Sequence, residues 1–191
     1  MLDNLKKYDI ILGSASPRRA ELLNGLDITF RIESNDVDEN YPENLTGVEI
    51  PMYLAQKKAS AYTLDENTLL ITADTIVWLD GTVYGKPTDQ KDARNMLRTL
   101  SGKMHQVITG VCIKSSVKST VFQATSDVYF AQFTDAEIEY YLDHYAPYDK
   151  AGSYGVQEWI GYIGVEHIEG SYFNVMGLPI QRLYNELKNW E

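Results

Sequence analysis

Hydrophobic and polar positions follow two patterns along the chain, short apolar runs and stretches whose apolar residues share one helical face. The apolar runs predict strands at 8–12, 28–33, 68–79, 83–84, 105–114, 120–133 and 160–168. The other pattern predicts helices that begin near Pro17, Pro51, Thr88, Thr134 and Ile180. Polar segments at 34–49, 146–154 and 170–179 are expected to be loops.

Local signals mark several of these boundaries. Ser16 and Pro17 suit the N-cap and first position of a helix. Thr134 with Glu137 forms a capping box, and Thr88 can cap the helix that follows it. Because βα units alternate with hairpins, we expect an α/β fold with a mixed central sheet flanked by helices.

Length and composition indicate one domain over residues 1–191, with room for two lobes around a cleft. The formal charge of −10 argues against a protein that wraps nucleic acid, although a few clustered cations could still bind a small anion. The single cysteine, Cys112, excludes a disulfide framework and lies in an apolar strand, which favours a core role. With no secretory signal and no membrane-spanning run, we expect a cytoplasmic protein, and the histidines lack the spacing of a zinc site.

Segment 11–23 carries the clearest indication of a binding site. A strand and a short polar turn lead into a helix whose first turn holds Arg18 and Arg19. The helix dipole disfavours cations there unless an anion offsets their charge. Backbone N–H groups, the hydroxyls of Ser14 and Ser16, and two guanidinium groups therefore predict a phosphate site. A capped helix with two solvated arginines is the alternative.

A carboxylate interrupts the apolar strand 68–79 at Asp74. Buried aspartate is rare unless it is paired or bound to a metal. Asp74 is therefore a candidate general base or metal ligand in a cleft. A strand-end aspartate that caps a neighbouring loop is the alternative.

Three further segments carry weaker signals. The run 81–86 lacks the spacing of a Walker motif, and Pro87 stands where Ser or Thr is required, so Lys86 is either a phosphate ligand or a solvated turn residue. The acidic run 36–39 could hold Mg²⁺ or be solvated. The loop 150–157 could clasp a base, with Gln157 reading its hydrogen-bonding edge, or be an ordinary loop.

Taken in order, short motifs along almost the whole chain resemble those of the Maf family of nucleoside triphosphate pyrophosphatases. The motifs are Ser14-Ala15-Ser16-Pro17-Arg18-Arg19, Asp38-Glu39, Leu54-Ala55 with Lys58-Ala59, Ala73-Asp74-Thr75, Gly85-Lys86-Pro87, Leu100-Ser101-Gly102-Lys103 with His105, Lys150-Ala151-Gly152 with Gly155 and Gln157, and Gly177-Leu178-Pro179. Each motif alone is weak evidence of a family, whereas the whole set in this order is specific. The resemblance implies a mixed twisted sheet, similar to that of ITPases, with two lobes around a substrate cleft.

The resemblance also implies a cytoplasmic, homodimeric enzyme that depends on a divalent cation, Mg²⁺ or Mn²⁺. The family cleaves nucleoside triphosphates between the α and β phosphates and releases pyrophosphate. By resemblance, Asp74 accepts the proton of the attacking water, and Glu39 and Asp74 bind the metal. The implied phosphate-binding residues are Ser14, Arg19, Lys58 and Lys86, and those for substrate choice are Arg18, Thr75 and Gln157.

Thr75 and Gln157 resemble the branch that acts on dTTP and UTP. Glu158 stands where many members have glycine, which adds a side chain beside the expected base reader. The alternatives are a pyrophosphatase for 7-methyl-GTP or modified nucleotides, and a non-catalytic nucleotide-binding regulator of division. Loss of the base or the metal ligand would mark such a regulator, but Asp74 and Glu39 are both present.

Overall fold

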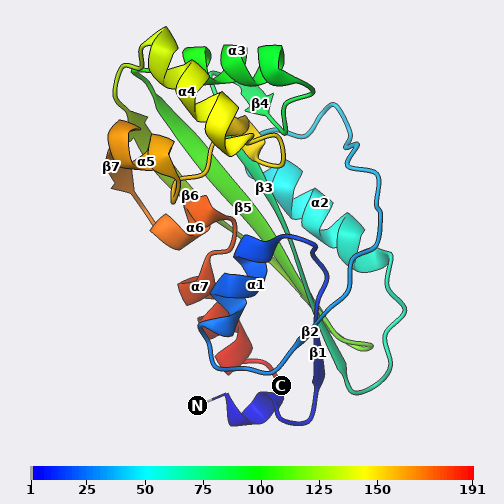
Figure 1. Ribbon diagram of the computed structural model, residues 1–191. Helices are drawn as coiled ribbons and strands as arrows, with labels where there is room; N and C mark the ends of the chain where they lie inside the picture. The colour runs from blue at the N-terminus through cyan, green and yellow to red at the C-terminus, as the bar shows by residue number, and fades with distance from the viewer. Residues whose placement is uncertain (1) are drawn as a thin grey trace. The chain divides into compact units, whose positions relative to one another are not determined.

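The structure, a computed structural model, describes residues 2–191 and contains one mixed sheet with helices around it (Figure 1). The strand order is β2-β1-β3-β5-β6-β7, and β4 pairs with β3 beside that path. The strands are β1 Asp9–Leu12, β2 Arg31–Ile32, β3 Thr68–Leu79, β4 Thr82–Tyr84, β5 Met104–Lys114, β6 Ser119–Phe130 and β7 Val165–Glu169. Strand β1 runs parallel to β2 and β3, whereas the β3–β4 and β6–β7 pairs are antiparallel, which confirms the predicted mixed α/β sheet.

The helices mostly follow the predicted signals. They are α1 Pro17–Asn24, α2 Glu49–Ser60, α3 Gln90–Leu100, α4 Asp135–Tyr145, α5 Trp159–Gly164, α6 Tyr172–Met176 and α7 Ile180–Lys188, with 3-10 turns η1 Asp3–Leu5 and η2 Ala151–Ser153. Pro17 opens α1, and Thr134 and Glu137 form the predicted capping box of α4. Across residues 2–191, none of the helices has the length and apolar character that crossing a membrane requires.

Some local predictions are wrong. Asp89 rather than Thr88 caps α3, because its carboxylate accepts from Asp92 N at 2.8 Å. The predicted strand 160–168 is helical up to Gly164, since an apolar run suits a buried helix as well as a strand. The expected loop 170–179 contains α6, and the predicted strand 28–33 is reduced to the two residues of β2.

The chain divides into two compact units. The first contains the residues up to Asp74, Thr109–Ala124 and Gly177–Glu191. Its helix α2 packs closely on the sheet, where the Thr72 hydroxyl donates to the Ala55 carbonyl at 2.7 Å. A Cβ on Gly110 of β5 would lie 2.2 Å from a backbone oxygen of α2, so glycine is required for this close approach.

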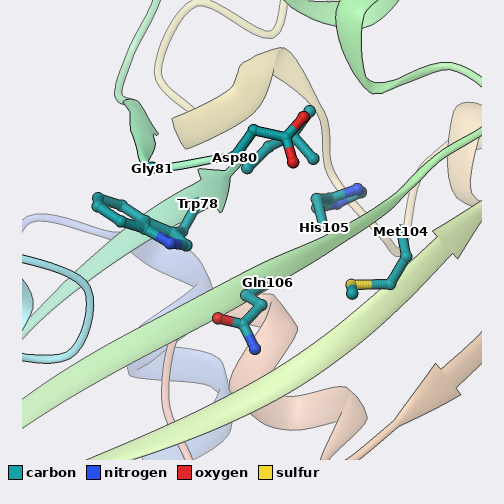
Figure 2. Close-up of a pocket in the computed structure, with 7 residues that line it drawn as sticks. Trp78, Asp80, Gly81, Met104, His105 and Gln106 are labelled. Atoms are coloured by element: carbon teal, nitrogen blue, oxygen red, sulfur yellow. The ribbon is translucent and has the colours of Figure 1, made fainter.

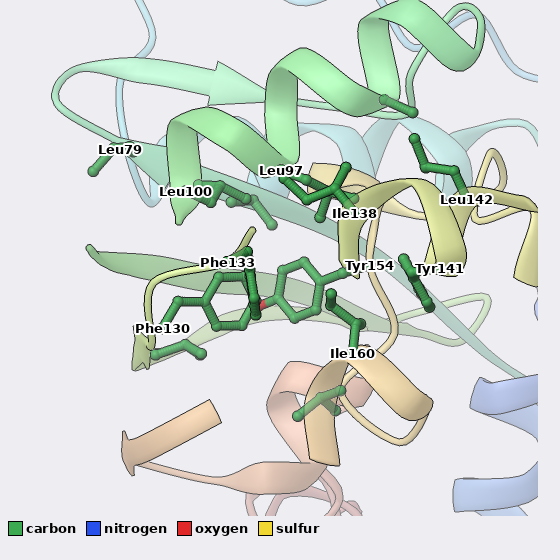
Figure 3. Packing of buried hydrophobic residues seen from close by; sticks show 14 of the residues in the cluster. Leu79, Leu97, Leu100, Phe130, Phe133, Ile138, Tyr141, Leu142, Tyr154 and Ile160 are labelled. Carbon is green, nitrogen blue, oxygen red and sulfur yellow. The ribbon is translucent and has the colours of Figure 1, made fainter. Parts of the chain in front are cut away.

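The second unit contains Thr75–Ile108 and Thr125–Met176 and has its own hydrophobic core. Helices α3 and α4 contact each other, and Figure 3 shows their apolar side chains directed toward aromatic residues that follow β6 and η2. The Phe130 and Tyr154 rings meet edge to face with centroids 4.8 Å apart. This core supports the loop that carries Gln157.

Candidate active site

The connection between β1 and α1 passes close to β3. A Cβ on Gly13 would lie 2.7 Å from the Thr72 methyl group, so a larger residue would push this connection away. Ser14 follows and is almost buried. Its Oγ accepts hydrogen bonds from Ser16 N and from Arg19 Nη1, both at 3.3 Å. Ser14 and Arg19 therefore form one polar corner, whose role as a phosphate site stays a prediction.

Arg19 links this corner to the start of the C-terminal segment. Its Nε donates to the Gly177 carbonyl at 2.9 Å. Burial lowers the pKa of the Arg19 guanidinium, the Asp74 and Glu39 carboxylates raise it, and the neighbouring Arg18 lowers it. The Gly177 contact had no predicted role, although Gly177 lies in one of the motifs that carry the family resemblance.

Lys58 brings the two predicted metal ligands together. Its Nζ donates to Asp74 Oδ1 at 2.6 Å and to Glu39 Oε1 at 2.8 Å. Asp74 lies on β3 and is 7% exposed, whereas Glu39 lies on the long exposed segment before α2. The structure thus joins a buried carboxylate, an exposed carboxylate and an ammonium within the first unit.

We call these residues of the first unit the Asp74 cluster; its members are Ser14, Arg18, Arg19, Glu39, Lys58 and Asp74. Its three cations and two carboxylates leave one excess positive charge in a chain whose net charge is −10. A local positive charge inside an acidic protein attracts small anions. The arrangement can therefore bind a phosphate group beside a buried carboxylate.

The donor set of Glu39 and Asp74 fits a magnesium ion. Both carboxylates already direct an oxygen at one positive charge, the Lys58 ammonium. Mg²⁺ is usually held by one or two carboxylates together with substrate phosphates and water. Among residues 2–191, no three His, Cys, Asp or Glu side chains are arranged around one metal position.

The other predicted site residues, Thr75, Lys86 and Gln157, belong to the second unit. Gly152 N donates to the Gly85 carbonyl at 3.0 Å, so the loop before Gln157 is tied to the segment that carries exposed Lys86. Thr75 directly follows Asp74 on β3 and is half-buried. The structure thereby links the segment that carries Lys86 to the loop that leads to Gln157.

Gln157 is half-buried, and its amide oxygen is fully covered. Among residues 2–191 no group donates a hydrogen bond to this oxygen. A covered acceptor without a donor is costly, so such an atom is a candidate contact for a bound ligand.

A cavity of about 230 Å³ lies elsewhere in the second unit, beside the β3–β4 turn and the start of β5 (Figure 2). It is lined by Trp78, Leu79, Asp80, Gly81, Met104, His105 and Gln106. Pockets for ligands of nucleotide size usually measure about 300–1,000 Å³. Since none of the proposed phosphate or metal residues lines this cavity, we do not assign it to the substrate.

Two side chains with reactive groups, Cys112 and His105, are buried in the core. Cys112 is completely buried in β5, and burial raises the pKa of its thiol, which agrees with the predicted core role. His105 is buried between aromatic rings and shares a 2.8 Å hydrogen bond with the Tyr154 hydroxyl. Sequence reasoning gave no role to Tyr141, which contacts the Gln157 loop, because nothing in its helical context distinguishes it from a core tyrosine.

Comparison with known proteins gives one consistent result. The profile of a family described as "Maf-like protein" matches residues 9–190. A Porphyromonas gingivalis protein named dTTP/UTP pyrophosphatase is 57% identical over 195 residues, which cover 100% of this chain and 98% of that protein. Proteins of the same name from Phocaeicola vulgatus and Flavobacterium psychrophilum are 59% and 48% identical, with 96% or more of each chain covered.

Among solved structures, the Staphylococcus aureus Ham1 protein resembles this chain with a TM-score of 0.51. The match covers 93% of this chain and 99% of that one, at 15% sequence identity. At this identity the likeness concerns the fold alone, and it agrees with the predicted ITPase-like architecture.

Proposed function

Because the chain belongs to the family of Maf-like proteins, we propose that it hydrolyses nucleoside triphosphates, dTTP and UTP foremost, to the monophosphate and pyrophosphate. The observation that carries this proposal is the buried Asp74 carboxylate held beside Lys58 and Glu39. The names of relatives that span the whole chain supply the substrate class.

Asp74 acts as the general base. It accepts a proton from a water molecule as that water's oxygen attacks the α-phosphorus. The bond between the α-phosphorus and the bridging oxygen breaks, and pyrophosphate leaves with the bonding electron pair. The Lys58 ammonium, 2.6 Å from Asp74 Oδ1, fixes the orientation of the carboxylate, whose other oxygen would accept the proton.

The cations of the cluster stabilise the charge that develops on the leaving pyrophosphate. Arg19 is held in place by its bonds to Ser14 and Gly177, so its guanidinium needs little reordering when phosphate binds. Arg18 lies close enough to Arg19 to lower its pKa, and a bound phosphate relieves that repulsion. Lys86 stays a proposed phosphate ligand.

Glu39 and Asp74 would hold a divalent cation. This assignment is supported by the approach of both carboxylates to the same positive charge, the Lys58 ammonium. When bound, Mg²⁺ or Mn²⁺ supplies positive charge to the phosphates beyond that of the side chains.

The Gln157 amide suits uracil and thymine. Both bases present an N3–H donor beside carbonyl acceptors, whereas cytosine presents an acceptor at N3. The covered Gln157 Oε1 would accept from that N3–H, and the amide NH₂ would donate to a neighbouring carbonyl. Rejection of cytosine follows, because two acceptors would face each other.

The test is incubation of the purified protein and Mg²⁺ with dTTP, UTP, CTP, GTP, ATP and 7-methyl-GTP, with pyrophosphate and phosphate measured separately. We expect pyrophosphate and monophosphate, formed fastest from dTTP and UTP. Preference for 7-methyl-GTP would assign the chain to the alternative of a 7-methyl-GTP pyrophosphatase. Binding of nucleotides without turnover would indicate a non-catalytic regulator. The homodimer and the cytoplasmic location implied by the resemblance stay predictions.

A further inference from the structure

The carboxylate of Glu158 lies against the loop that precedes it and does not cap its own helix. Glu158 is the N-cap residue of α5, and its side chain makes no capping hydrogen bond. One of its oxygens accepts a hydrogen bond from the Tyr141 hydroxyl. The other lies 3.1 Å from Lys150 Nζ. Both carboxylate oxygens are therefore engaged within the second unit.

Tyr141 connects three segments through one hydroxyl group. Its side chain is fully buried on the inner face of α4 (Figure 3). The hydroxyl donates to Glu158 and accepts a hydrogen bond from Gly155 N at 3.0 Å. Burial and the Glu158 carboxylate raise the pKa of Tyr141, so the phenol keeps the proton that it donates. Helix α4, the loop and the start of α5 are thus joined at one point.

Lys150 completes the charge balance of this network. It is 8% exposed, and its Nζ also lies 2.7 Å from Asp149 Oδ1. A buried ammonium needs paired carboxylates to offset the cost of its desolvation. The negative charge of Glu158 is consequently balanced beside Gln157 and does not repel a triphosphate.

Gln157 lies on the short turn that this network encloses. Glu158 N donates to the Gly155 carbonyl at 3.0 Å, which closes the turn 155–158. A Cβ on Gly155 would lie 2.8 Å from Glu158 Cδ, so the carboxyl group packs directly on the Gly155 backbone. The Glu158 side chain therefore packs on Gly155 at one end of the turn and is itself bonded to Tyr141 at the other end.

We propose that Glu158 is a positioning residue for base selection, which fixes the turn 155–158 so that the Gln157 amide meets a uracil or thymine edge in one orientation. This inference rests on the proposed function, in which Gln157 contacts the base. Glu158 itself does not touch the substrate. Its effect is on discrimination between bases and not on the chemistry at the α-phosphorus.

The test compares kcat and KM for UTP, dTTP and CTP in the full-length chain and its variants. In Glu158→Ala we expect the kcat/KM ratio of UTP to CTP to fall about tenfold, mainly through KM for UTP. We expect kcat for UTP to stay within about twofold of the wild type. Glu158→Gln should recover most of the ratio, because its amide oxygen can still accept from Tyr141. Glu166→Ala, an exposed change on β7 of the same unit, is the matched control.

A merely structural role for Glu158 predicts a lower melting temperature with an unchanged UTP to CTP ratio, and that result would overturn the inference. Both residues act on one turn, so their effects should overlap. The double variant Tyr141→Phe with Glu158→Ala should therefore lose less of the UTP to CTP ratio than the sum of the two single losses. Fully additive losses would contradict the shared network.

Gln157→Ala separates this inference from the proposed function. If Gln157→Ala loses base discrimination and Glu158→Ala retains it, Glu158 is not a positioning residue and the proposed function stands. If the wild-type chain hydrolyses neither UTP nor dTTP, the proposed function fails and the inference fails with it.

Discussion

Lys58 is the side chain on which the charge balance of the Asp74 cluster depends. Its Nζ lies between the Asp74 and Glu39 carboxylates, at distances of 2.6 and 2.8 Å. Residue type alone would make Lys58 a solvated helix lysine, and only the family resemblance assigned it to the phosphates. Its importance follows from where α2 places it.

We expect Lys58→Met to lower kcat/KM for UTP about 100-fold, because it removes a positive charge from the phosphate site and the orienting partner of Asp74. Initial rates of pyrophosphate release measure the effect. Lys91→Met, an exposed change on α3, should leave the rate unaltered and serves as the control. Wild-type kcat/KM in Lys58→Met would remove Lys58 from the site.

The position of helix α2 on the sheet matters for the site, because this helix carries Lys58. The Cβ that Gly110→Ala introduces would lie 2.2 Å from the Pro51 carbonyl oxygen, so α2 must move away from β5. We expect this variant to lose about 1–3 kcal/mol of unfolding free energy and to lose activity, because Lys58 moves with the helix.

Urea unfolding followed by circular dichroism, together with the pyrophosphate assay, checks both effects. Gly85→Ala is the control for stability, since nothing lies within 4 Å of the added Cβ. Unchanged stability and rate in Gly110→Ala would mean that the close approach of α2 to β5 has no bearing on the site.

The extent of sequence prediction differs between elements. The boundaries of β3 and the capping box of α4 follow from local pattern, and both were predicted correctly. Helix α5 was missed because residues 160–164 carry an apolar run whose helical state depends on packing against the preceding loop. In this helix a Cβ on Gly161 would lie 1.9 Å from the Val156 carbonyl oxygen.

For the candidate site, too, the sequence predicted some features and missed others. Residue types in family-like motifs identified Ser14, Arg19, Glu39, Lys58 and Asp74, and the structure brings these five together. Contacts to the Gly177 carbonyl and the Tyr141 hydroxyl could not be predicted. They join segments distant in sequence through a backbone carbonyl and a core phenol, groups to which residue type alone assigns no role.

For the stability of the protein in acid, His105 is the most informative group. Burial lowers the pKa of this histidine from 6.5 to about 4. Between those values the unfolded chain binds a proton that the folded chain does not, so stability is retained above pH 6.5 and falls as the pH drops toward 4. This linkage amounts to about 3 kcal/mol across the window.

His105→Phe should therefore flatten the dependence of unfolding free energy on pH between 7 and 4.5. The variant should also be less stable than the wild type at pH 7, because the buried Tyr154 hydroxyl loses its 2.8 Å partner. Denaturant unfolding at several pH values provides the slopes. Equal slopes in the two proteins would show that His105 does not govern acid stability.

In the proposed mechanism, hydrolysis depends on the Asp74 carboxylate, which is almost buried at the end of the first unit. Asp74→Asn keeps the size and the polar contacts of that side chain but cannot take a proton from water. Asp80→Asn is a matched control, because Asp80 is an exposed turn residue with a φ of 49°, which asparagine adopts readily.

The decisive measurement is the rate of pyrophosphate release from UTP and dTTP by these two variants and the wild type, with folding verified by melting temperature. We expect Asp74→Asn to fold normally and to lose activity about 1,000-fold, while Asp80→Asn matches the wild type. A folded Asp74→Asn variant that releases pyrophosphate at the wild-type rate would contradict the assignment of Asp74 as the base.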